Sequence, residues 1–347
     1  MTDDLLIERL LRVIDEGRRT ATYKLALVLG IIDAAAMCPG SAVLANRLIA
    51  ERVVALYYPQ TRAYVAADGI QRELRQITMK DSPVLRSVLR LRLHGDNAGC
   101  RSADEARRAI PTEYERAVSG VEDTFVRYPI PLMQVVGSRA VPFLYSIDWP
   151  EGTSAKTLRS EGKAFIQLLD GVADRLAVLG PLLRPLIELH WTSDVARWSG
   201  VALEDDALRA HLFGSQRVAF PRGLVSGLRE LQNDVCFYCG DRLAPKTEVD
   251  HFLAWSRWPN DAIENLVIAD ACNGAKSDHL AAGLHLVKWR RHVEELTGDL
   301  AAVADRQRWL SDPARTCALV QTTYSHIAAG TPLWRLGKEF ELASGPL

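Results

Sequence analysis

The chain has 347 residues, of which 48% are hydrophobic and 24% charged, and its formal net charge is −1. These values are typical of a soluble globular protein with two or three domains, and the absence of a low-complexity run or internal repeat excludes a repeat architecture. A net charge near zero gives no indication of nucleic-acid binding. A local basic groove would nevertheless be enough to bind nucleic acid.

The N-terminus lacks the charged-then-apolar layout of a secretory signal. The most apolar stretch begins at Leu25, is too short to span a bilayer and is interrupted by Asp33. We therefore expect a buried core helix over residues 25–37, and a cytoplasmic protein with no membrane partner.

Helical patterns dominate the first part of the chain. Residues 3 to about 93 carry apolar side chains at helical spacing. Ser82 is expected to cap a helix that ends at Gly95, and Ser102 is expected to cap the next one.

The pattern changes between residues 128 and 152, where prolines and short aromatic or β-branched runs predict loops and a two-stranded element. Helices resume over residues 171–191, with a break expected at Gly180 and Pro181. They return after Ala281 and continue through Phe340. The expected fold is mainly α: a multi-helical scaffold with a small β-containing insert near residues 234–280.

Three cysteines converge on this insert. Cys236 and Cys239 have the spacing at which one turn presents two thiolates to a tetrahedral zinc ion. Without a secretory signal, metal binding is expected rather than a disulfide. Cys272 supplies a third ligand if the hairpin folds back. The fourth ligand is left open between Asp270, the nearest donor, and His279, and the alternative for the pair is two unmetallated thiols in a turn.

The segment from residue 248 to 278, EVDHFLAWSRWPNDAIENLVIADACNGAKSD, gathers polar residues around two short apolar strands. Asp250 and His251 lie on the first expected strand, where alternation puts His251 on the opposite side from Asp250. Asn265 precedes the second strand. Cys272 and Asn273 open a helix that continues to Lys276.

Together these residues resemble the HNH endonucleases, the ββα-metal nucleases found among restriction and homing enzymes. The resemblance covers about residues 236–278. It implies a small ββα-metal domain with a zinc knuckle, embedded in the helical scaffold. The implied domains are a helical N-terminal region for substrate or partner binding (1–229), an HNH nuclease domain (230–284) and a C-terminal helical region (285–347).

The resemblance also implies a role for each polar residue. His251 would be the general base that takes a proton from the attacking water, as suits a side chain that titrates near neutrality. Asp250 and Asn273 would hold one divalent cation, Mg²⁺, against the scissile phosphate, with open positions left for water and substrate. Asn265 would fix the loop that orients His251.

One departure from the family pattern concerns zinc. Many zinc-bearing members carry a second cysteine pair at the start of the helix, whereas Ala269 stands three residues before Cys272 in this chain. The segment from Asn265 to Asn273 is also one residue shorter. The departure leaves the fourth zinc ligand undecided and does not remove any residue of the catalytic set.

Three residues are candidates for DNA contact. Lys276 would reach phosphate from an exposed helix face, with a solvated lysine as the alternative. Arg257 and Trp258 lie between the expected strands and would reach the DNA backbone or a groove. The alternative is that Trp255 and Trp258 pack the small domain, which is the preferred interpretation for Trp255.

The expected function is therefore a metal-dependent HNH endonuclease that hydrolyses DNA phosphodiester bonds, in restriction or anti-phage defence. DNA and other defence-system proteins are the expected partners. A double-strand break would need a homodimer or two successive cleavage events by one molecule. A second enzymatic version is a nicking nuclease that is guided by partner proteins. A non-enzymatic alternative is a zinc-stabilised nucleic-acid-binding module without catalysis. Another is a helical scaffold whose insert is only structural.

Overall fold

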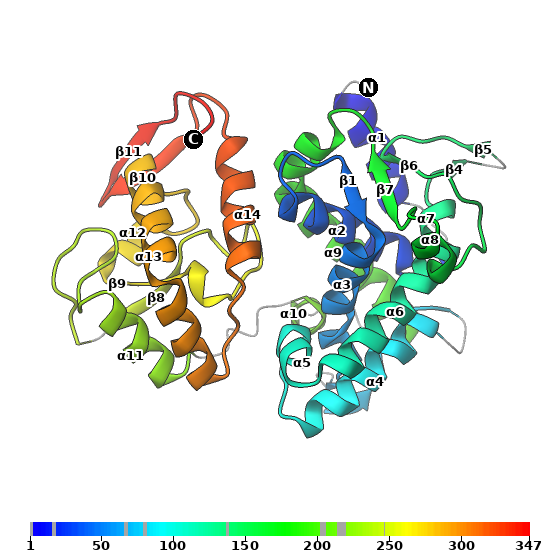
Figure 1. Cartoon of the computed structure of the whole chain (residues 1–347), viewed down its shortest axis with the longest axis horizontal. Coiled ribbons are helices and arrows are strands. Elements are labelled where there is room, and N and C mark those ends of the chain that lie inside the picture. Colours follow the sequence, from blue (N-terminus) through cyan, green and yellow to red (C-terminus); the bar gives the residue numbers. More distant parts are fainter. Residues whose placement is uncertain are drawn as a thin grey trace. The chain divides into compact units, whose positions relative to one another are not determined.

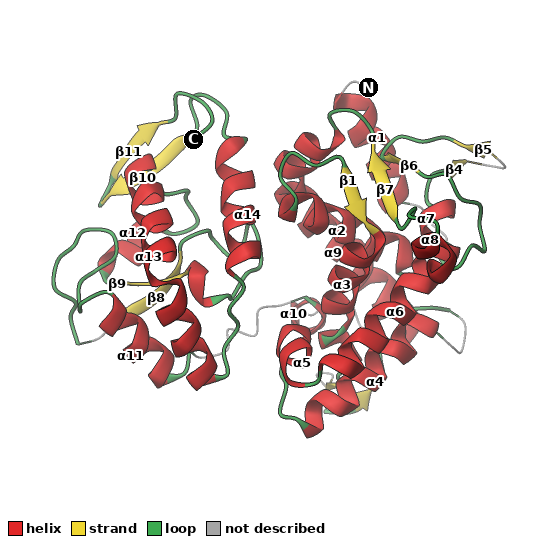
Figure 2. Cartoon of the chain, viewed as in Figure 1, coloured by secondary structure: helices red, strands yellow, loops and turns green. Residues whose placement is uncertain are grey.

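The structure is a computed structural model that describes residues 3–15, 19–65, 69–78, 82–136, 139–201, 206–213, 220–245 and 247–347. The chain divides into two compact units, Met1–Arg217 and Val218–Leu347. Helices predominate in both units and the strands are short (Figure 2). The prediction of a mainly α fold with small β elements is confirmed.

The first unit is built from helices that surround α2, and Figure 1 labels its elements. Eleven residues of α2 between Leu25 and Ala36 are buried, which confirms the predicted core helix. Helix α2 packs against α3 and α9, and α6 packs against α3 and α4. The helices of this unit are α1 (Asp3–Ile14), α2 (Tyr23–Met37), α3 (Asn46–Tyr57), η1 (Pro59–Thr61), α4 (Pro83–Asn97), α5 (Ala103–Ala109), α6 (Pro111–Arg127), α7 (Pro129–Leu132), α8 (Ala155–Ser160), α9 (Val172–Ser199) and α10 (Asp206–Leu212).

Short antiparallel strands accompany these helices. A three-stranded sheet has the order β1-β7-β6, with Leu44 opposite Ile166. Two hairpins complete the strands, and the pair β4–β5 is the two-stranded element predicted between residues 128 and 152. The strands are β1 (Val43–Ala45), β2 (Tyr64–Val65), β3 (Gln71–Arg72), β4 (Val135–Val136), β5 (Arg139–Ala140), β6 (Tyr145–Ser146) and β7 (Phe165–Leu168).

The predicted helix caps are present, but one predicted helix end is wrong. The Ser82 and Ser102 hydroxyls each accept a backbone N–H three residues on, both at 3.1 Å. Helix α4 runs past Gly95 to Asn97. A Cβ at Gly95 would lie 2.3 Å from the Tyr58 hydroxyl oxygen, so this glycine permits close packing and does not end the helix.

The predicted break at Gly180 and Pro181 is also wrong. Helix α9 runs without interruption from Val172 to Ser199, with Pro181 and Pro185 inside it. Its buried face includes Ile187 and Trp191 and packs on α2. Burial of this face outweighs the two hydrogen bonds that the prolines cannot make.

The second unit holds the cysteines and the polar segment. Helix α13 packs on α11 and on η2, and α12 packs on β8 and β10 (Figure 1). The elements are α11 (Arg222–Leu231), β8 (Glu248–His251), η2 (Ile263–Asn265), β9 (Leu266–Ala269), α12 (Ala271–Lys276), α13 (Gly283–Gln307), α14 (Pro313–Ser325), β10 (Pro332–Leu336) and β11 (Glu339–Leu342).

The second unit contains both the expected nuclease segment 230–284 and the expected C-terminal segment 285–347, and it begins before α11. Helix α13 packs on α11, η2 and α14. The expected helix through Phe340 is wrong: the chain ends in the β10–β11 hairpin. Gly337 adopts φ +56° at its turn, and the fully buried Trp334 exchanges backbone hydrogen bonds with Leu280 and Ala282. No helix among the described residues is long and apolar enough to cross a membrane.

Candidate functional site

The polar residues singled out by the sequence lie on a hairpin and the helix that follows it. Strands β8 and β9 pair antiparallel, with Asp250 opposite Val267 and His251 opposite Leu266. All four residues of β9 are buried, which anchors the hairpin in the core of the unit. Helix α12 begins two residues after β9 and packs on β8. Strand β8 therefore carries Asp250 and His251, η2 directly before β9 carries Asn265, and α12 carries Asn273.

Asn265 holds both ends of the loop that follows His251. Its amide nitrogen donates to the carbonyls of Leu253 and Asn260, both at 3.0 Å, and its oxygen accepts the N–H of Leu253 at 2.9 Å. The side chain is fully buried. These bonds fix the shape of residues 252–262, and the effect of this loop on catalysis stays a prediction.

His251 contacts a carboxylate that the sequence analysis missed. Its Nε2 lies 2.8 Å from Oδ1 of Asp261, and its side chain is 20% exposed. The Asp261 carbonyl accepts the indole N–H of Trp309 at 2.7 Å, which fixes this part of the loop. In the tautomer whose Nε2–H donates this hydrogen bond to Asp261, Nδ1 is the acceptor nitrogen of the ring. The signal available in the sequence was the aspartate four residues before Asn265.

Asp250 and Lys276 form a buried ion pair. The Lys276 ammonium lies 2.9 and 3.3 Å from the two Asp250 oxygens, and it donates to the His251 carbonyl at 2.8 Å. The Tyr238 hydroxyl donates to Oδ2 of Asp250. Burial raises the pKa of Asp250, and Lys276 and Tyr238 oppose that rise. Both carboxylate oxygens of Asp250 thus already have partners.

Two expectations are corrected by this pair. Lys276 is fully buried and not on an exposed helix face, because the carboxylate it neutralises is itself inside the unit. A buried ammonium is unavailable to DNA phosphate. The Asp250 carboxylate is likewise buried, whereas the expected Mg²⁺ site leaves open positions for water and substrate.

The two predicted Mg²⁺ ligands have different partners. Asp250 contacts Lys276 and Tyr238, whereas the Asn273 amide donates to Oε2 of Glu248 at 2.5 Å. Glu248 is exposed on β8 and was not singled out from the sequence. It is the carboxylate that contacts Asn273.

The residues between β8 and β9 that were expected to contact DNA or to pack the domain differ in their exposure. Trp258 is 2% exposed and packs inside the unit, while Trp255 is half-buried. Arg257 is also half-buried, and its Nε is buried with no hydrogen-bond partner among the described residues. The packing interpretation therefore applies to Trp258, and a DNA contact from this loop rests on Arg257.

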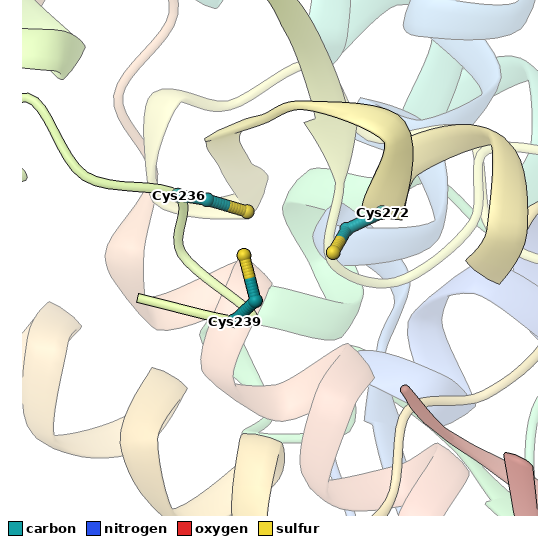
Figure 3. A group of neighbouring side chains, drawn as sticks. All are labelled: Cys236, Cys239 and Cys272. Carbon is teal, nitrogen blue, oxygen red and sulfur yellow. The ribbon is translucent and has the colours of Figure 1, made fainter. Parts of the chain in front are cut away.

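The three cysteines expected at a zinc site come together. Their sulfur atoms all lie within 4.8 Å of one another, and Figure 3 shows the three side chains pointing into one space. The turn that carries the first two is held by the Phe237 N–H, which donates to the Ile268 carbonyl at 3.0 Å. Gly240 completes the turn with φ +80°. This hydrogen bond thus fixes the turn to β9, and α12, which carries Cys272, begins two residues after β9.

The chemistry of this sulfur cluster suits a metal cation. Burial raises the pKa of the Cys236 thiol, but backbone hydrogen bonds from Cys239, Asp270 and Tyr238 outweigh it and bring the pKa below its ordinary value. Burial and the two neighbouring cysteines raise the pKa of Cys272 to about 12. A divalent cation would compensate the repulsion that keeps three thiolates from forming together, and soft thiolates suit zinc.

The predicted fourth ligand does not join the cluster. Asp270 contributes no oxygen to the group of sulfur atoms, and its Oδ2 accepts the N–H of Ala244 at 3.1 Å. That hydrogen bond points the carboxylate at the loop before β8. The expectation of Asp270 as a zinc ligand is not met in this arrangement.

Comparison with known proteins identifies a family for the first unit. A family described as Domain of unknown function (DUF8808) matches residues 4–212, which is more than half of the chain. The chain belongs to this family. No curated protein and no solved structure matches it. The cysteine cluster and the polar residues of the hairpin lie outside the matched segment.

Proposed function

We propose that the protein is a metal-dependent HNH endonuclease that hydrolyses DNA phosphodiester bonds, with its active site in the second unit. The observation that carries the proposal is that His251 on β8, Asn265 at the end of η2 and Asn273 on α12 lie in consecutive elements around the β8–β9 hairpin, in the same unit as a three-cysteine cluster. The order of elements, two antiparallel strands followed by a helix, supports a ββα-metal domain. A purely structural insert has no need of this set.

His251 is the proposed general base. It is partly exposed, and one of its two ring nitrogens, Nε2, is hydrogen-bonded to the Asp261 carboxylate. No described residue hydrogen-bonds the other nitrogen, which would accept a proton from the water molecule that attacks phosphorus. Asn265 keeps the loop that carries Asp261 in place through its bonds to Leu253 and Asn260. A positioned base of this kind contributes about 10²–10⁴-fold to the rate.

The proposed divalent cation is Mg²⁺, and the donors available to it are hard oxygen atoms. Asn273 and a carboxylate of β8, either Asp250 or Glu248, would hold the ion, which when bound supplies positive charge beside the scissile phosphate. Asp250 forms an ion pair with Lys276. It can therefore bind the metal ion only if one of its carboxylate oxygens is released from the Lys276 ammonium. Glu248 is exposed and already contacts Asn273.

The same ion pair favours a second candidate function. A carboxylate that is buried and neutralised by Lys276 suits a zinc-stabilised nucleic-acid-binding module that does not bind Mg²⁺. In that case the hairpin and helix would present a DNA-binding surface, and the protein would not cleave. Arg257 is the remaining proposed contact to DNA.

The biological setting is proposed by family analogy alone. Restriction or anti-phage defence in the cytoplasm would supply DNA as substrate and other defence-system proteins as partners. One HNH centre cuts one strand. A double-strand break would therefore need a homodimer or two successive visits.

The test is nicking of supercoiled plasmid by the purified full-length chain, with Mg²⁺ or with a chelator. We expect Mg²⁺-dependent nicking that falls by about 10²–10⁴-fold in His251→Ala. His190→Ala, which changes a histidine of α9, serves as the matched control and should nick like the parent. Full cleavage by folded His251→Ala would overturn the assignment of the base. Tight DNA binding without nicking by the parent would support the binding module instead.

A further inference from the structure

Among the residues that the structure describes, the three-cysteine cluster has no histidine, carboxylate or cysteine as a fourth member. Structural zinc is almost always tetrahedral with four protein ligands, whereas sites with three protein ligands keep one position for water or another small ligand. The sulfur atoms of Cys236, Cys239 and Cys272 all lie within 4.8 Å of one another, and no histidine, carboxylate or further cysteine among the described residues belongs to this group. The donor set therefore resembles an open site.

The nearest candidates for a fourth ligand are engaged elsewhere. The Asp270 carboxylate accepts the N–H of Ala244 at 3.1 Å. His279 is exposed, and its ring meets the edge of Phe340 with the centroids 4.9 Å apart. Ala269, which stands where a second C-x-x-C pair would begin, is buried on β9 and has no donor atom.

The two histidines of α13 near the cysteine turn pack against aromatic rings, and each also has one buried ring nitrogen, Nδ1 of His285 and Nε2 of His292, with no hydrogen-bond partner among the described residues. His285 bonds the Arg335 carbonyl through Nε2 at 2.6 Å and stacks on Trp334. His292 packs against the Phe237 ring at a centroid distance of 5.8 Å. Both rings contact aromatic side chains beside the cysteines, and neither belongs to the sulfur cluster.

We propose that a metal ion held by the three cysteines has an open fourth coordination position, occupied by water and exchangeable for a small neutral donor. Three thiolates with a divalent cation leave one excess negative charge. A carboxylate in the fourth position would add another charge in a half-buried site, which is costly. Water adds none. The inference does not depend on the proposed nuclease, since it concerns only the metal and its ligands.

Cobalt substitution tests the proposal without any measurement of cleavage. The full-length chain is loaded with Co²⁺, and its absorption is recorded with and without imidazole. We expect charge-transfer intensity for three thiolates and a saturable shift of the d–d bands on addition of imidazole. Cys272→Ser should lose roughly one third of the charge-transfer intensity, since one of three thiolates is removed. Cys317→Ser, which changes an exposed cysteine of α14, should keep the parent spectrum.

Two further variants decide whether the position is open. Asp270→Asn keeps an acceptor for the Ala244 N–H while it removes the carboxylate, and His279→Ala removes the nearby imidazole. We expect both to retain the parent spectrum and its response to imidazole. Cobalt d–d bands that do not shift at saturating imidazole in the folded parent would overturn the proposal. So would a changed spectrum in Asp270→Asn or His279→Ala, because that residue would then be the fourth ligand.

Discussion

The ammonium of Lys276 lies 2.9 Å from Oδ2 of Asp250, with the two side chains 0% and 8% exposed. One residue belongs to α12 and the other to β8, so the ion pair joins the helix to the hairpin. The Tyr238 hydroxyl and the His251 carbonyl take up further hydrogen bonds of the pair. Two buried charges are tolerated here because each has its partner.

Removal of one partner should therefore destabilise the second unit. We expect Lys276→Met to lower the free energy of unfolding by about 3–5 kcal/mol, since it leaves the Asp250 carboxylate buried without a countercharge. The measurement is equilibrium denaturation of the full-length chain, followed by tryptophan fluorescence. Lys338→Met, at an exposed position after β10, is the matched control and should change stability by less than about 0.5 kcal/mol.

A double variant separates the ion pair from simple loss of packing. Asp250→Asn combined with Lys276→Met removes both charges, so its cost should be smaller than the sum of the two single costs. If the two costs add, the charges do not interact, and the pair does not stabilise the contact of α12 with β8.

Asn265 offers a second stability test. Asn265→Ala leaves the carbonyls of Leu253 and Asn260 and the N–H of Leu253 without their partner, and we expect a loss of about 2–3 kcal/mol. The loop of residues 252–262 should also become a site of proteolytic cleavage. Denaturation and limited proteolysis measure the two effects. A variant as stable and as resistant as the parent would show that the loop is held by its apolar contacts alone.

Asp261 should matter for the proposed reaction through His251. We expect Asp261→Ala to slow plasmid nicking by less than His251→Ala does, because the base remains but its ring is no longer oriented by a carboxylate. The readout is the single-turnover nicking rate of parent and variants at one Mg²⁺ concentration. Equal rates for Asp261→Ala and the parent would remove Asp261 from the mechanism.

Local patterns in the sequence predicted much of this architecture. The caps at Ser82 and Ser102, the apolar helix after Leu25 and the convergence of three cysteines depend on neighbouring residues or on regular spacing. Pro181 shows the limit of such reasoning. A helix that buries one face against α2 tolerates a residue that a local rule treats as a break.

The pairings within the site could not be predicted in the same way. Lys276 lies in a helix of six residues, and whether such a short helix hides or exposes a lysine depends on the strand it meets. The contacts of Lys276 with Asp250, Asn273 with Glu248 and His251 with Asp261 each join separate segments of the chain. Spacing along the chain is enough to identify the candidate residues. Which residue each of them contacts depends on the packing of the tertiary structure.

Metal removal should destabilise the second unit selectively, because the cysteine cluster ties the turn at residues 236–240 to α12. Binding to the folded state alone adds about 2.7 kcal/mol of stability when free zinc is 100 times its dissociation constant. We expect chelation or Cys236→Ser to lower the melting temperature of that unit, and Cys317→Ser to leave it unchanged. Zinc analysis and calorimetry measure this, and zinc-free protein with an unchanged melting temperature would contradict it.

The half-buried His292 predicts how this unit responds to acid. Burial lowers the pKa of His292 below its ordinary value of 6.5, and Lys288 adds repulsion. The folded state therefore favours the neutral ring, so its contribution to stability is complete above about pH 6.5 and is lost as the pH falls through the lower folded value. We expect His292→Phe, which keeps a ring against Phe237, to reduce the loss of unfolding free energy between pH 7 and pH 5. Parallel stability curves for parent and variant would show that His292 does not control this response.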